Sequence, residues 1–123
     1  MSPDVVETAL ARCRVLLSKE RAGELREVDP VPSPESLGAL AAIGFEAEDR
    51  PVRVSVYVIP DRERQAAAVD RLAAEHPARE GGDSKIATNG PMLFFGEADT
   101  SGPEGLETTF RLAEIVSAFA GDE

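Results

Sequence analysis

The fold is decided by residues 51–74, PVRVSVYVIPDRERQAAAVDRLAA. Within residues 52–59, valine occupies every second position from Val52 to Val58, which is the period of a β-strand with one buried face. Pro60 ends the strand because it has no backbone N–H to donate to a neighbouring strand. Asp61 then stands at the position of a helix N-cap, and helical spacing follows it. The stretch therefore predicts a strand followed at once by a helix over residues 62–75.

The chain before this unit contains a helix, a connector and one ambiguous segment. Apolar residues at helical spacing predict an amphipathic helix within residues 1–25. Three prolines at alternate positions predict an extended, proline-rich connector over residues 26–35. The next sequence, SPESLGALAAIGF at residues 33–45, opens with a helix-start signature, so we favour a short helix there. A strand over residues 40–45, paired with residues 52–59, is the alternative.

The chain after the central unit predicts a β-hairpin and a last helix. Residues 85–97 contain Asn89-Gly90, the preferred pair for a tight hairpin turn. The apolar run from Met92 to Phe95 is typical of a strand that is covered on both faces. Over residues 106–120, one wide apolar stripe predicts a helix that lies across a sheet. The stripe consists of Leu106, Phe110, Leu112, Ala113, Ile115, Val116 and Phe119.

These elements predict a single domain over residues 1–123 that belongs to the α+β class, with its core at 36–121. The order after the N-terminal helix is β-α-β-β-α, which implies a small sheet of three or four strands with the helices mainly on one face. A strand at 40–45 would complete a four-stranded, ferredoxin-like arrangement. A right-handed crossover through the central helix would make the two strands that it joins parallel.

Four structural motifs of the chain form a pattern. They are Val54-Ser55-Val56-Tyr57 with Asp61, the alanine-rich Ala66–Ala74, Asn89-Gly90 and the last helix Ala113–Gly121. This pattern resembles a group of small bacterial α+β domains without an assigned activity, which are often found in exported or lipid-anchored proteins. The resemblance covers about half of the chain and implies no activity, cofactor or partner. The N-terminus departs from that group because it has neither a signal sequence nor a lipidation cysteine.

The overall charge limits the class of partner. The net charge is −10, and residues 61–123 contribute −7 of it with six bases and thirteen acids. A nucleic-acid-binding protein needs clustered lysines and arginines, so we expect no nucleic-acid partner. No apolar run is long enough for a membrane span. The single cysteine, Cys13, excludes an internal disulfide and fits a cytoplasmic location; the alternative is an exported domain whose signal has been removed.

The residue types that usually carry chemistry are sparse. Cys13 lies on the apolar stripe of the first helix, which is typical of a core residue. His76 is the only histidine and stands at the end of a helix, where a cation is favoured. The acidic segment 97–108 matches a calcium loop only in part, because Thr108 replaces the final glutamate. We therefore predict no catalytic residue, cofactor or metal site and do not expect an enzyme.

Arg53, Ser55 and Tyr57 are the candidate binding residues. They alternate with the valines and so lie on the opposite face of the same strand. If both helices cover the valine face, these residues form an exposed sheet face, which is typical of a protein interface. We expect a non-enzymatic interaction domain that binds another protein or a second copy of itself through this sheet face.

Two other functions stay open. A small-ligand-binding domain or an enzyme of unknown type would have to use carboxylates together with Arg53 and Tyr57. An acidic accessory partner of a basic protein is suggested by the charge of residues 61–123.

Overall fold

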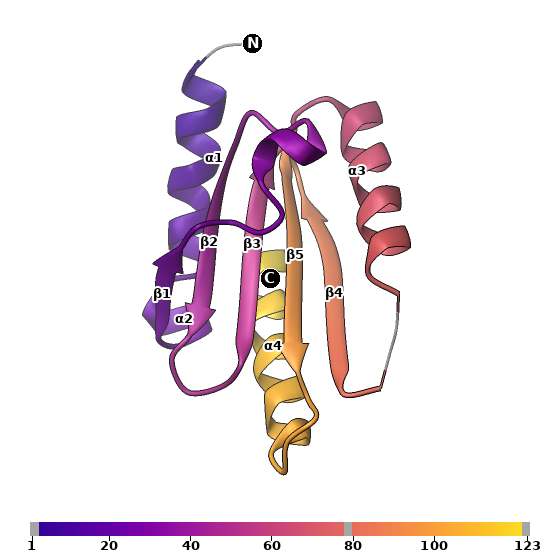
Figure 1. The fold of residues 1–123 in the computed structure, drawn as a ribbon. Helices are drawn as coiled ribbons and strands as arrows, with labels where there is room; N and C mark the ends of the chain where they lie inside the picture. Colours follow the sequence, from indigo (N-terminus) through magenta and orange to yellow (C-terminus); the bar gives the residue numbers. More distant parts are fainter. Residues whose placement is uncertain (1–2, 78–79, 122–123) are drawn as a thin grey trace.

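A computed structural model of the chain describes residues 3–77 and 80–121. One antiparallel sheet has the strand order β1-β2-β3-β5-β4, and helices lie on both of its faces (Figure 1). The elements in chain order are α1 (Pro3–Leu16), α2 (Lys19–Ala22), β1 (Leu25–Val28), the 3₁₀ helix η1 (Pro34–Leu37), β2 (Ala41–Ala47), β3 (Val52–Val58), α3 (Arg62–Glu75), β4 (Gly82–Asn89), β5 (Met92–Asp99) and α4 (Gly105–Ala120).

The predicted α+β class is confirmed, but the predicted sheet is wrong in detail. The sheet has five strands instead of three or four, and every neighbouring pair is antiparallel. The two strands that the central helix joins, β3 and β4, run in the same direction, as expected, because both are antiparallel to β5. The central helix α3 joins β3 to β4, and β5 lies between these two strands in the sheet. The ferredoxin-like arrangement is not formed, because β1 adds a fifth strand and α3 and α4 lie on opposite faces of the sheet.

The segment over residues 33–45, where we favoured a short helix, contains a short 3₁₀ helix followed by a strand, so the alternative of a strand over residues 40–45 is confirmed. Its first part forms η1, which ends at Gly38, a residue with a left-handed φ of 71°. Its second part forms β2, which pairs with β1 on one side and β3 on the other. Gly44 lies within β2, where a Cβ atom would be only 2.7 Å from the carbonyl oxygen of Val28. Glycine at this position therefore allows a close approach of the chain at the end of β1.

The two faces of the sheet carry two separate apolar clusters. The first face is covered by α1, α2 and α4, and it contains the β3 valines together with Phe94 and Phe119. The second face is covered by α3 and η1, and it contains Tyr57 and Phe95. Figure 1 shows α4 behind the sheet and η1 in front of it. The prediction that α3 and α4 lie on the same face is therefore wrong, whereas the double coverage of the Met92–Phe95 run is confirmed.

The predicted β-hairpin is confirmed. β4 pairs with β5 from Gly82↔Asp99 to Asn89↔Met92 around the turn at Gly90. The two residues of the turn are Gly90 and Pro91 and not the predicted pair Asn89-Gly90, since Asn89 is paired with Met92. Gly90 has the positive φ of 61° that the first position of such a turn requires. The helices described in this structure include none with both the length and the apolar character needed to cross a membrane.

Candidate functional site

Ser55 and Tyr57 are buried, with exposed fractions of 1% and 0%. The proline-rich connector crosses β3 at this point and covers both side chains. The Ser55 hydroxyl accepts a hydrogen bond from the Val31 N–H at 3.2 Å. The Tyr57 hydroxyl donates to the Pro32 carbonyl oxygen at 2.5 Å. The two residues thus hold the connector against the sheet, and the sheet face is closed at their positions.

The buried hydroxyl of Tyr57 stays protonated over the ordinary pH range. Burial raises the pKa of Tyr57 to about 12, although a hydrogen bond with Ser55 partly opposes this shift. The neutral hydroxyl is the form that can donate to the Pro32 carbonyl. Tyr57 therefore acts here as a structural donor between the sheet and the connector.

Arg53 is exposed and belongs to a row of charges across the sheet. The strand register places Arg26 opposite Glu46, Glu46 opposite Arg53, and Arg53 opposite Glu97. Glu46 pairs with Arg26 and with Arg53, whose Nη2 atom is 3.0 Å from a Glu46 oxygen. The hydrogen bond from Arg26, followed by the one from Arg53, lowers the pKa of Glu46. This alternation of charges supports the strand register.

His76 and Glu97 meet at an open hollow of about 270 Å³ that Asp83 and Ser84 also line. The His76 Nδ1 atom is 3.4 Å from a Glu97 oxygen, and its ring lies 4.7 Å from the Phe95 ring centre. Local sequence patterns do not predict this partner, because Glu97 lies on a different element, β5. Among the residues described, no group of three or more histidine, cysteine, aspartate or glutamate side chains is arranged to hold a metal ion. The pair fixes the end of α3 against β5.

Cys13 is fully buried in the first apolar cluster. Burial raises the pKa of its thiol to about 12, and the nearby charges of Arg14 and Glu27 have smaller effects. A reactive cysteine needs its thiolate form, which this environment disfavours. Cys13 is a core residue.

The outer face of α4 carries an apolar stripe that no part of the described chain covers. Leu106 and Phe110 are 65% and 62% exposed, and the stripe continues through smaller exposed residues at helical spacing. We call the whole set the outer stripe: Leu106, Phe110, Ala113, Ser117 and Ala120. It contains no charged residue, although 29% of the chain is charged. The N-terminal part of α4 also extends past the ends of the strands (Figure 1).

The prediction that Leu106, Phe110 and Ala113 belong to the buried stripe is wrong. The buried face of α4 instead consists of Thr108, Arg111, Leu112, Ile115, Ala118 and Phe119. Arg111 is buried because its guanidinium group donates to several oxygens on other segments. It bonds the carbonyl oxygens of Ala22 and Glu24 and the carboxylates of Asp49 and Glu114. The local spacing of α4 does not predict these partners. All of them except Glu114 lie more than 60 residues away in the sequence.

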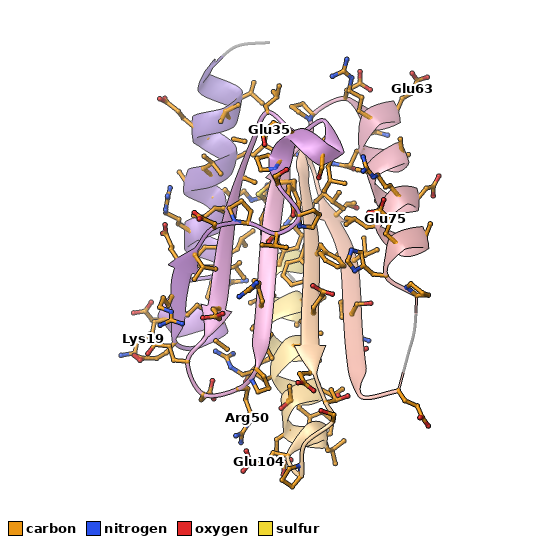
Figure 2. All side chains as sticks on the ribbon, in the orientation of Figure 1. Lys19, Glu35, Arg50, Glu63, Glu75 and Glu104 are labelled. Carbon is orange, nitrogen blue, oxygen red and sulfur yellow. The ribbon has the colours of Figure 1, made fainter. Side chains whose placement is uncertain are left out.

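Acidic residues border the outer stripe on one side. A hollow of about 370 Å³ beside α4 is lined by Gly23, Glu24, Glu48, Asp49, Arg111 and Glu114. The one base in this lining, Arg111, is already bonded within it. Glu107 lies on the same side of the helix as Glu114, two turns earlier. Figure 2 shows Glu104 at the N-terminal end of α4 beside Arg50, to which it is ion-paired at 2.7 Å.

Gly23 allows Arg111 to reach this position. Its φ of 81° lies in the left-handed region, and a Cβ atom there would be 2.8 Å from the Arg111 Nη2 atom. The chain between α2 and β1 therefore bends closely around the guanidinium group.

No family model, curated protein or solved structure matches this chain. Only the side chains themselves therefore indicate a function. Two features define the candidate site: the uncharged outer stripe of α4 and the acidic border beside it.

Proposed function

We propose that this chain is a non-enzymatic protein-interaction domain that binds its partner through the outer stripe of α4. The single observation that carries the proposal is the exposure of Leu106 and Phe110 on a helix face without charge. These side chains contribute little to the stability of the chain while they face water. Covering both of them with a partner would contribute about 3 kcal/mol to binding. Large apolar side chains grouped on one face are typical of a contact surface.

The proposal moves the interaction surface from the sheet to α4. The connector is hydrogen-bonded to Ser55 and Tyr57, so a partner could contact these two candidate residues only if the connector were displaced. Arg53 stays exposed, but it is engaged with Glu46 in the charged row. The exposed apolar side chains of α4 have no comparable bonds to lose, which supports binding at this helix.

The test uses three synthetic amphipathic peptides of about 18 residues that share one leucine- and phenylalanine-rich face. Their remaining positions carry lysine, glutamine or glutamate. Amide NMR spectra of the whole chain are recorded with each peptide, and sedimentation measures self-association. We expect at least one peptide, or a second copy of the chain, to shift the amides of residues 106–117.

A double variant, Leu106→Ser with Phe110→Ser, is expected to lose these shifts. The matched control, Arg64→Ser with Ala67→Ser, alters two exposed positions of α3 and is expected to keep them. If the chain is monomeric and none of the three peptides shifts the amides of α4, the proposed function is wrong.

A further inference from the structure

The charges around the outer stripe identify its occupant. We propose that the outer stripe binds a positively charged amphipathic helix of another protein, with lysine or arginine along one border of its apolar face. This inference rests on the proposed function, since it names the partner of the same surface.

The acidic border supplies the first argument. Glu107 and Glu114 follow one side of the outer stripe, and the hollow beyond them adds Glu24, Glu48 and Asp49. Within the part of the chain that the structure describes, neither Glu48 nor Glu107 forms an ion pair. Glu24 is already paired with Lys19, and Asp49 and Glu114 are paired with Arg111. A partner that covered the stripe with acidic or neutral side chains would leave Glu48 and Glu107 unneutralised. A basic border on the partner complements them.

The opposite border of the stripe has a different chemistry. Thr109 and Val116 lie there, and both are half-buried and uncharged. The partner helix therefore needs bases along one border only. The side of the partner's apolar face that carries the bases then determines whether the partner lies parallel or antiparallel to α4.

The size of the side chains indicates how a helix would fit. The outer stripe runs from Leu106 to Ala120, which corresponds to about 21 Å of helix. Its first half presents two large side chains, whereas Ala113, Ser117 and Ala120 let another backbone come close. A partner helix of about four turns fits this length, and the stems of its lysines or arginines reach sideways toward the hollow.

A second copy of the chain complements this surface less well. In an antiparallel pair of α4 helices related by a two-fold axis, the same border of each helix faces the other copy. Glu107 and Glu114 of the two copies would then meet each other. Each copy also has a net charge of −10, so the remaining field opposes association.

The three peptides described above distinguish these partners when their affinities are measured by calorimetry. The lysine peptide is expected to bind about tenfold more tightly than the glutamine peptide at low salt, and the glutamate peptide more weakly than both. The preference for lysine is expected to shrink as salt screens the charges. Glu48→Gln with Glu107→Gln is expected to remove most of the preference and to leave the affinity for the glutamine peptide unchanged.

A control variant separates the local border from the net charge. Glu63→Gln with Asp70→Asn changes the net charge equally but lies on the exposed face of α3, and it is expected to keep the preference. If this control reduces the preference as much as the α4 variant does, the inference is wrong. Equal affinities for the three peptides, or a stripe-dependent dimer that ignores the lysine peptide, would overturn the inference and leave the proposed function standing. If no peptide binds at α4 and no dimer forms, the proposed function itself fails.

Discussion

The helices α3 and α4 cover opposite faces of one sheet, and each packs apolar side chains of its inner face against it. α3 buries Ala68 and Leu72, whereas α4 buries a wider apolar set that includes Leu112 and Phe119. Their outer faces differ. The exposed face of α3 mixes acids and bases, namely Arg62, Glu63, Arg64, Asp70, Arg71 and Glu75. The exposed side of α4 consists of the uncharged outer stripe with Glu107 and Glu114 along one border.

The comparison shows two differences on α4: its one base is buried, and a large aromatic side chain faces water. On α3 the charges face water, and Arg71 pairs with Glu75 one turn later at 3.0 Å. On α4 the one base, Arg111, is only 8% exposed, while Phe110 faces outward. Burying a guanidinium group costs desolvation, which its oxygen acceptors offset. A helix needs only its inner face to stabilise a sheet, which is why we propose that a partner covers the apolar outer face of α4.

The largest predicted effect comes from removing buried contacts that the two helices make with the sheet. Leu72→Ala in α3 and Leu112→Ala in α4 each delete a fully buried side chain and leave a cavity. Each is expected to lower the free energy of unfolding by about 2–5 kcal/mol. Urea denaturation followed by circular dichroism measures both values. If Leu112→Ala changed stability by less than about 1 kcal/mol, α4 would not be a structural helix of the core.

The central strand and helix could be predicted from sequence because their signals are local. The alternating valines of β3 need only their own spacing, and Asp61 caps α3 by accepting hydrogen bonds from the N–H groups of Glu63 and Arg64. The strand β1 has four residues and a half-exposed pattern, and it is defined by its pairing with β2. No local period marks such a strand.

The face of the sheet that each helix covers could not be predicted from the sequence, for a related reason. Phe94 and Phe95 are adjacent, and each enters a different apolar cluster, so both sheet faces need a cover. The sequence shows that β5 is buried on both sides but not which helix lies on which side. The outer stripe could not be predicted either, because α4 has more apolar residues than its inner face can bury. With Leu112, Ile115 and Phe119 packed in the first apolar cluster, the period of the helix turns Phe110 outward.

The next predicted effect concerns the connector that closes the α3 side of the sheet. Tyr57→Phe removes the hydrogen bond to Pro32 and is expected to lower the free energy of unfolding by about 1 kcal/mol near pH 8. The pKa of Tyr57 is raised to about 12 in the folded chain, above the ordinary value of 10. Its contribution is therefore complete below pH 10 and is lost as the pH rises toward 12.

The difference between wild type and Tyr57→Phe is thus expected to shrink by about 1 kcal/mol between pH 9 and pH 11. Because Tyr57 is the only tyrosine and the chain has no tryptophan, its ultraviolet absorbance reports the titration directly. Titration near pH 10 would contradict the burial of this hydroxyl. It would also reopen the sheet face as a binding surface.

The smallest predicted effect is on the outer faces where α3 and α4 differ. Phe110→Ser on α4 and Arg64→Ser on α3 both change side chains that face water. Each is expected to change the free energy of unfolding by no more than about 0.5 kcal/mol, again measured by urea denaturation. A loss of about 2 kcal/mol or more for Phe110→Ser would mean that Phe110 stabilises the isolated chain. A small loss means that this aromatic side chain contributes little to the free energy of unfolding, because apolar area that stays in water contributes nothing to folding. It would contribute only when a partner covers it.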